Sequence, residues 1–348
     1  MKPLISVVMP IYNEAAHLRD VVASLLAQQL VSADLEVLLI DGMSNDGSHD
    51  IANALAKADA RVRVFQNAQR TTPYAFNIGL REARGSYVAI LGAHSQYAPD
   101  YLEVCLNELF RNKAVGCSGR VIPRVSDDTL QAHLALWVLS HPFGVSGSSF
   151  RTQPEGFADT IPYAVFVKQA LLEAGGYDVK MTRNQDNDMN HKLVKAGGKL
   201  YLTWKTHCYY FTRRDLKGVM RYAQGNGSWC AVSFLTRPGS LGLRHYIPAV
   251  FALIVLNAIV WLVLAAMLGG WLVPAALVMA APLVVHLLAG SLASLQMLMK
   301  TKHVAALLLP PIFFAFHFTY GFSFLTRLLD ELRGKQEQPS AVVQSGRT

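Results

Sequence analysis

The stretch ISVVMPIYNE at residues 5–14 decides the fold. Its first seven residues are mostly apolar and rich in Val and Ile, which is typical of a strand buried in a parallel sheet. Asn13 and Glu14 then precede LRDVVASLLAQQ, whose apolar residues recur with a helical period, so we expect a capped helix there. Strand, loop and helix together predict the first unit of an α/β fold.

The same alternation continues to about residue 91. We expect strands at residues 35–40, 61–66 and 87–91 and helices at 49–57 and 71–85, which implies a mostly parallel sheet with helices on both faces. Such sheets bind ligands at the carboxyl ends of their strands. Residues 12–14, 41 and 92–95 directly follow strands and are therefore the first candidates for a binding site.

The composition indicates a membrane protein. Only 16% of the residues are charged and 52% are hydrophobic, whereas soluble proteins usually carry about 25% charged residues. Three apolar stretches, at residues 246–268, 271–291 and 304–325, are each near the about 20 residues that span a bilayer. Gly269 and Gly270 predict a tight hairpin between the first two. Pro310 and Pro311 leave open whether the third stretch spans the membrane or is broken.

Charge and processing signals bear on location. The net charge is +8, and basic residues interleave with aromatic ones between residues 205 and 244, as in an interfacial helix that faces anionic lipid. A solvated charged face over core aromatics is the alternative. We find no nucleic-acid motif and expect no nucleic-acid partner.

The N-terminus lacks signal-peptide features, and the positive-inside rule places Lys300 and Lys302 in the cytosol. We therefore expect a multi-pass protein of the inner (cytoplasmic) membrane with a cytosolic catalytic domain. The four cysteines are far apart in sequence and predict free thiols.

Four motifs occur in a familiar order: SVVMPIYNE, EVLLIDGMSNDGS, NIGLREARGSYVAILGAH and NQDND, ahead of the basic segment. Together they resemble the inverting glycosyltransferases of family 2, and among these the ExoA-type enzymes of succinoglycan and related exopolysaccharide synthesis. The resemblance covers residues 4–229. It implies a GT-A fold, with a Rossmann-like nucleotide-binding sheet and an acceptor subdomain, followed by transmembrane helices.

The resemblance also divides the chain. We expect a nucleotide-sugar-binding half at residues 1–95 and an acceptor and catalytic half at 96–215. A basic aromatic interfacial segment at 216–245, a transmembrane region at 246–325 and a polar tail at 326–348 follow.

Tyr12 and Asp41 end adjacent predicted strands. One can stack on a flat base while the other accepts a hydrogen bond from a uracil imide, which favours uridine. The resemblance implies the same role for Asp41 and places Glu14 in that pocket. Alternatively, Tyr12 is a core residue, Asp41 or Asp46 is a turn-former, and Asn77 is a helix cap. The predicted nucleotide-binding residues are Pro10, Tyr12, Glu14, Asp41 and Asn77.

Family members usually carry Asp-x-Asp after the fourth strand, where the carboxylates bind the donor ribose and a divalent metal. Here the positions are Gly92, Ala93 and His94. The resemblance implies that His94 ligates the metal, Mn²⁺ or Mg²⁺, and a neutral imidazole suits manganese better. A strand-end histidine without a metal role is the alternative. The ribose contact is missing at Gly92.

Glycosyl transfer with inversion requires a base that deprotonates the acceptor hydroxyl. Asp186 matches the catalytic Asp of the family, with Gln185 in place of the usual Glu. A helix N-terminus should lower its pKa; simple capping is the alternative role. Residues expected to contact acceptor or diphosphate are Arg183, Gln185, Asp188 and Trp229. The segment QGNGSW at 224–229 lacks the Gln-x-x-Arg-Trp of processive enzymes.

The sequence therefore predicts a membrane-anchored enzyme that moves a hexose, glucose from UDP-glucose, to a polyprenyl-diphosphate-linked oligosaccharide in exopolysaccharide biosynthesis. Other polysaccharide-assembly proteins are conceivable partners. Two alternatives stay open: a catalytically silent sugar-nucleotide-binding subunit and a processive polysaccharide synthase.

Overall fold

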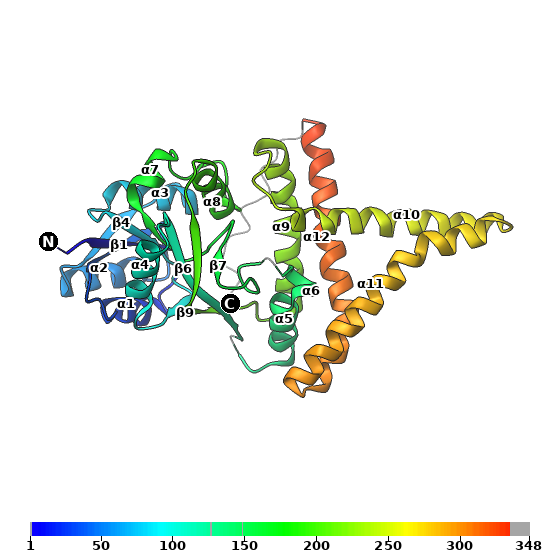
Figure 1. Ribbon diagram of the computed structural model, residues 1–348, viewed down its shortest axis with the longest axis horizontal. Helices are drawn as coiled ribbons and strands as arrows, with labels where there is room; N and C mark the ends of the chain where they lie inside the picture. The colour runs from blue at the N-terminus through cyan, green and yellow to red at the C-terminus, as the bar shows by residue number, and fades with distance from the viewer. Residues whose placement is uncertain (1, 126, 148, 335–348) are drawn as a thin grey trace. The chain divides into compact units, whose positions relative to one another are not determined.

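A computed structural model describes residues 2–125, 127–147 and 149–334 (Figure 1). The chain forms two compact units. The first contains Met1–Pro123 and Gln153–Phe211, and the second contains Arg124–Thr152 and Thr212–Thr348. Of the predicted polar tail, residues 326–332 belong to the last helix and 335–348 lie outside the described residues. The predicted division of residues 1–215 into donor and acceptor halves stays a prediction.

The first unit begins with the predicted alternation. Parallel strands lie in the order β3-β2-β1-β4, where β1 is Leu4–Ile11, β2 is Asp34–Asp41, β3 is Val62–Gln66 and β4 is Tyr87–Ile90. The connecting helices are α1 (Leu18–Leu26), α2 (Ser48–Ala58) and α3 (Thr72–Glu82). These elements confirm the strands and helices expected in this part of the sequence.

Burial on both faces explains the apolar runs in the central strands. Val7, Val8 and Met9 of β1 have no exposed surface, and neither does Leu38 of β2. Gly79 brings α3 directly onto this layer, because a Cβ there would meet Cγ1 of Val8 at 2.2 Å. The helix can approach β1 this closely only without a side chain at position 79.

The rest of the first unit makes the sheet mixed rather than mostly parallel. Strand β8 (Val165–Val167) pairs antiparallel with β4 and with β6 (Gly116–Arg124), and β5 (Ser95–Tyr97) and β7 (Gly156–Phe157) pair antiparallel with β9 (Leu200–Phe211). The helices of this part are α4 (Tyr101–Arg111), α7 (Lys168–Glu173) and α8 (Gln185–Lys195). Antiparallel partners distant in sequence leave no periodic signal, so the alternation could not predict this half.

The second unit is helical. Its helices are α5 (Leu130–Ser140), α6 (Pro142–Val145), α9 (Leu216–Thr236), η1 (Leu243–His245), α10 (Ile247–Leu268), α11 (Leu272–Thr301), η2 (Val304–Leu308) and α12 (Leu309–Leu332). Among the described residues, three helical stretches are long and apolar enough to cross a membrane: Leu243–Leu268, Leu272–Thr301 and Val304–Leu332.

Two details of these stretches answer expectations from the sequence. Gly269 and Gly270 form the tight turn between α10 and α11, with φ angles of +63° and +60° that glycine adopts readily (Figure 1). Pro310 and Pro311 lie in the first turn of α12, where a proline interrupts no helical hydrogen bond. The third stretch is therefore a continuous helix from residue 309.

All four cysteines are free and buried, as expected. Cys105, Cys117 and Cys208 lie in the first unit and Cys230 lies in the second. None of them is more than 1% exposed.

Candidate active site

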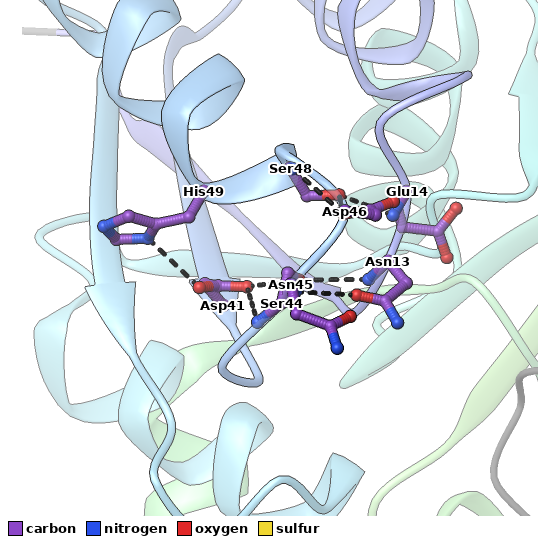
Figure 2. A network of polar contacts seen from close by, with 8 residues as sticks. All are labelled: Asn13, Glu14, Asp41, Ser44, Asn45, Asp46, Ser48 and His49. Atoms are coloured by element: carbon purple, nitrogen blue, oxygen red, sulfur yellow. Dashed lines mark hydrogen bonds and ion pairs between the residues drawn. The ribbon is translucent and has the colours of Figure 1, made fainter.

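Asp41 ends β2 and is 1% exposed. Its Oδ1 accepts hydrogen bonds from the backbone nitrogen and the hydroxyl of Ser44, at 3.2 and 2.6 Å, and its Oδ2 lies 3.1 Å from Nδ1 of His49 (Figure 2). A buried carboxylate requires such partners, because desolvating an unpaired charge is costly. A carboxylate offers about four acceptor positions, so these three contacts leave about one of them unfilled.

The loop after β1 is tied to the loop after β2. The backbone nitrogen of Asn13 donates to the hydroxyl of Ser44 at 3.0 Å, and its side-chain Oδ1 accepts from the backbone nitrogen of Asn45 at 3.0 Å. The backbone nitrogen of Glu14 donates to the hydroxyl of Ser48 at 2.6 Å. Figure 2 shows these contacts as one network around the ends of both strands.

Asp46 acts as the turn-former in this network. Its Oδ1 accepts from the backbone nitrogen and the hydroxyl of Ser48, at 3.0 and 2.6 Å, and its Oδ2 accepts from the backbone nitrogen of Ala15 at 3.0 Å. Desolvation acts to raise the pKa of Asp46, but these hydrogen bonds outweigh it and lower the pKa. Asp46 therefore stabilises the loop as an anion.

Glu14 contacts His94, which follows β4. Glu14 is 7% exposed, and its Oε1 lies 2.6 Å from Nε2 of His94. Because an ionised carboxylate can only accept, Nε2 carries the hydrogen, and the lone pair of a neutral ring lies on Nδ1. Nδ1 is buried and has no hydrogen-bond partner among the residues described. Metal-binding histidines commonly donate their other N–H to a carboxylate in this way.

The donor set fits a metal that takes most of its ligands from a substrate. Within the described ranges, no group of three or more His, Cys, Asp or Glu side chains gathers around one point. Ions that bind nucleotide phosphates often have only one or two protein ligands. His94 could supply one of them through Nδ1, with Glu14 orienting the ring from the other side, and the imidazole favours Mn²⁺ over Mg²⁺.

Asp186 lies in the first turn of α8. It is exposed on one side, and on the other it lines a small hollow together with Tyr163, Tyr177 and Met189. Desolvation on that side raises the pKa of its carboxyl to about 6, although water on the open side limits the effect. The expectation that the helix N-terminus lowers this pKa is therefore wrong, because desolvation outweighs the helix end.

Three other residues of the predicted acceptor group lie at or just before the start of α8, and the fourth belongs to the second unit. Asp188 is 3% exposed, and its Oδ2 pairs with Nζ of Lys192 at 2.7 Å. Gln185 is the first residue of α8, and Arg183 precedes it by two positions. Trp229 belongs to α9 of the second unit and is 4% exposed. Their contacts with acceptor or diphosphate stay predictions.

Three of the predicted nucleotide-binding residues, Asn77, Tyr12 and Pro10, have different surroundings. The amide of Asn77 is tied to the backbone of Tyr177, because its Nδ2 donates to the carbonyl of that residue at 2.7 Å and its Oδ1 accepts from its nitrogen at 2.8 Å. Tyr12 is half-buried, and a Cβ on Gly42 would lie 3.5 Å from its ring. Pro10 pairs with Ile40 inside the sheet. The contact of Asn77 with the nucleotide stays a prediction.

Comparison with known proteins identifies the family. The glycosyl transferase family 2 profile matches residues 6–174. The succinoglycan biosynthesis protein ExoA of Rhizobium meliloti (strain 1021) is 30% identical over 262 residues, which cover 74% of this chain and 78% of that protein. The chain belongs to glycosyltransferase family 2. It is accordingly an enzyme, a glycosyltransferase, related to the ExoA group as the sequence motifs indicate.

A second relative extends the similarity to nearly the whole length of this family 2 chain. It is the dolichyl N-acetyl-alpha-D-glucosaminyl phosphate 3-beta-D-2,3-diacetamido-2,3-dideoxy-beta-D-glucuronosyltransferase of Methanococcus voltae. The two are 26% identical over 328 residues, which cover 91% of this chain and 95% of that protein.

A solved structure supports the fold. The mannosyltransferase PcManGT from Pyrobaculum calidifontis, in complex with GDP-Man and Mn²⁺, has a TM-score of 0.57 to this chain at 21% identity. The match covers 97% of this chain and 89% of that chain. The predicted GT-A fold is thereby confirmed.

Sequence reasoning missed the residues that hold the site together. His49, Ser44 and Ser48 fix the loops at Asp41 and Glu14, and Tyr97 holds the backbone of Gly92. The segment GMSNDGS is visibly rich in turn formers, which could have pointed to the two serines. The role of Tyr97 depends on tertiary contacts and leaves no local signal.

Proposed function

We propose that this glycosyltransferase inverts the anomeric centre as it transfers a hexose, glucose from UDP-glucose, to a polyprenyl-diphosphate-linked oligosaccharide in exopolysaccharide biosynthesis. One observation carries the proposal. Asp186, at the start of α8, combines an open side with a desolvated side that raises its pKa to about 6. A carboxyl with a raised pKa is a stronger base than an ordinary aspartate, yet it is ionised at neutral pH.

In the proposed reaction, Asp186 accepts the proton of the acceptor hydroxyl. The acceptor oxygen forms a bond to the anomeric carbon as the bond from that carbon to the diphosphate oxygen breaks, and the nucleoside diphosphate leaves. A single displacement of this kind converts an α-linked donor into a β-linked product. No covalent enzyme intermediate is required.

The donor contacts are assigned to the ends of β1, β2 and β4. Asp41 would accept a hydrogen bond from the base, Tyr12 would lie against it, and Pro10 and Glu14 would border the pocket. His94, oriented by Glu14 at 2.6 Å, would hold the divalent metal. When bound, the metal neutralises charge on the diphosphate leaving group.

The apolar helices and the relatives support the proposed acceptor and location. A lipid-linked acceptor is confined to the bilayer, and this chain carries three helical stretches that could cross one. The Methanococcus voltae relative is named for a dolichyl phosphate-linked acceptor. We place the protein in the inner membrane with the first unit in the cytosol. The basic and aromatic residues of 216–245, Trp229 among them, would lie near the lipid headgroups.

The test is nucleotide release by the full chain in detergent. The protein is supplied with membrane-extracted lipid-linked acceptors, Mn²⁺ and one donor at a time: UDP-glucose, UDP-galactose or GDP-mannose. We expect acceptor-dependent release from UDP-glucose that Asp186→Asn removes. Release from another donor alone would overturn the donor assignment, and a long polymer product would favour a processive synthase. UDP binding without release from any donor would favour a silent subunit.

A further inference from the structure

Gly92 leaves a gap in the proposed donor site. It directly follows β4 and has no side chain at the position where the resembled family places a carboxylate. Its backbone is nevertheless fixed, because the hydroxyl of Tyr97 accepts from its nitrogen at 2.8 Å and donates to its carbonyl oxygen at 3.1 Å. The backbone at position 92 is therefore fixed, but no side chain at this position can contact a ligand.

The pairing of β4 with β8 places Tyr163 beside this gap. The backbone nitrogen of Ile90 donates to the carbonyl of Ala164 at 3.0 Å, so Tyr163, the residue before Ala164, lies near the end of β4. A Cβ on Gly92 would have one group within 4 Å, the Cε1 atom of Tyr163 at 3.3 Å. A side chain at position 92 would thus point at the phenol ring.

The backbone and ring of Tyr163 are held in place. Its φ of +52° lies in the left-handed region, which a bulky residue rarely adopts and which is enriched at functional sites. Its carbonyl accepts from the hydroxyl of Tyr101 at 2.7 Å, and its ring meets Tyr97 edge to face with centroids 6.2 Å apart. Tyr163 also lines the hollow that contains Asp186. Its side chain therefore reaches the end of β4 and lines the same hollow as the proposed base.

We propose that Tyr163 supplies the donor contact that Gly92 cannot make, through a hydrogen bond from its phenol to a ribose hydroxyl of the nucleotide. This inference rests on the donor site of the proposed function. A phenol can donate and accept, whereas a carboxylate only accepts. The phenol is also neutral, so the exchange removes a negative charge that would repel the diphosphate.

The contact is tested with a thermodynamic cycle that removes the phenol hydroxyl of the enzyme, a ribose hydroxyl of the ligand, or both. Isothermal titration calorimetry on the full chain in detergent compares UDP with 2′-deoxy-UDP and 3′-deoxy-UDP, for wild type and Tyr163→Phe. We expect wild type to lose about 3- to 10-fold in affinity with one deoxynucleotide, the range for one hydrogen bond. Tyr163→Phe should bind UDP more weakly than wild type by the same factor. It should bind that deoxynucleotide as tightly as wild type does, because the hydrogen bond is already absent.

The matched control is Tyr87→Phe, at the opposite end of β4, which should bind all three nucleotides like wild type. Unchanged UDP affinity in Tyr163→Phe would overturn the proposal. So would losses that simply add when phenol and ribose hydroxyls are both removed, because the two groups would then act independently.

An exchange of side chains provides the second test. Gly92→Asp should weaken UDP binding in the wild-type background, because the new side chain meets the ring of Tyr163, and should strengthen it in the Tyr163→Ala background. The same effect in both backgrounds would contradict the proposal. Failure here is distinguishable from failure of the proposed function, because these variants report donor affinity whereas Asp186→Asn reports transfer.

Discussion

The imidazole of His94 and the carboxylate of Glu14 meet at 2.6 Å although they follow different strands. The parallel pairing of β1 with β4 brings them together, because it aligns the carboxyl ends of both strands. The contact fixes the ring and leaves Nδ1 as the nitrogen that faces away from the carboxylate.

Replacing Glu14 by Gln should weaken metal activation about 10- to 100-fold, the usual effect of losing a carboxylate behind a histidine ligand. The measurement is a Mn²⁺ titration of donor turnover. Glu103→Gln on α4 is the control, since that carboxylate binds the Ser32 backbone and hydroxyl instead. An unchanged Mn²⁺ midpoint in Glu14→Gln would exclude the proposed metal role of the pair, and His94→Ala should give at least as large an effect.

The rate of transfer should fall as the pH drops through about 6, because the pKa of Asp186 is raised to about 6 and only the ionised form can accept a proton. The measurement is kcat from pH 4.5 to 8. Asp186→Glu should retain a shifted pH profile with reduced kcat, whereas Asp186→Asn should retain UDP affinity within a few-fold and lose transfer. Comparable loss of UDP binding and transfer in Asp186→Asn would contradict the base assignment.

Asp186→Asn should also raise the melting temperature at neutral pH. A carboxyl whose folded-state pKa lies above its unfolded value is costly to ionise in the folded protein, so wild type loses stability as the pH rises from about 4 to 7. The difference in Tm between variant and wild type should grow over that interval. Asp59→Asn is the control, and it should lower the Tm at neutral pH, because hydrogen bonds from Arg61 lower the pKa of Asp59 and stabilise its ionised form.

Asp41→Ala should weaken UDP binding about 10- to 100-fold, as expected for losing a hydrogen bond to a charged group. Binding is measured by calorimetry. Asp34→Ala is the matched control, because Asp34 begins the same strand and is exposed. If both variants bind UDP like wild type, Asp41 acts only through its contacts with Ser44 and His49.

Gly321→Ala should destabilise the second unit by about 1–3 kcal/mol, the usual cost of overpacking. A Cβ at this position of α12 would lie 1.8 Å from the carbonyl oxygen of Pro248 in α10, so the helices would have to separate. Thermal unfolding in detergent measures the effect. Gly290→Ala serves as the control, because its nearest neighbour would be the Phe143 ring at 3.4 Å. Equal melting temperatures would mean that α10 and α12 do not pack as described.

The sequence predicts the parallel half of the sheet because each strand there is a short apolar run followed by a helix with its own periodicity. Leu35–Ile40 could be placed from local pattern alone, and β2 indeed covers it. The short strands β5, β7 and β8 have two or three residues each and depend on partners distant in sequence. No window of the sequence contains that information.

The candidate site was also only partly predictable from the sequence. Asp41, Glu14 and His94 follow predicted strands, so their shared edge could be anticipated. The raised pKa of Asp186 could not, because it results from neighbours such as Tyr177 that approach only in the folded chain. The contact of the Asn77 amide with Tyr177 was equally hidden, since this partner lies 100 residues further along the sequence.

Because all four cysteines are buried, the native enzyme should react only slowly with thiol-reactive probes. Thiols with at most 1% exposure react slowly with water-soluble maleimides, so a single cysteine introduced at a surface position would dominate the labelling. Cysteines placed in turn at Gly270 and Lys302 would report which side of a sealed vesicle each turn faces. The membrane orientation could thus be mapped without first removing any natural cysteine.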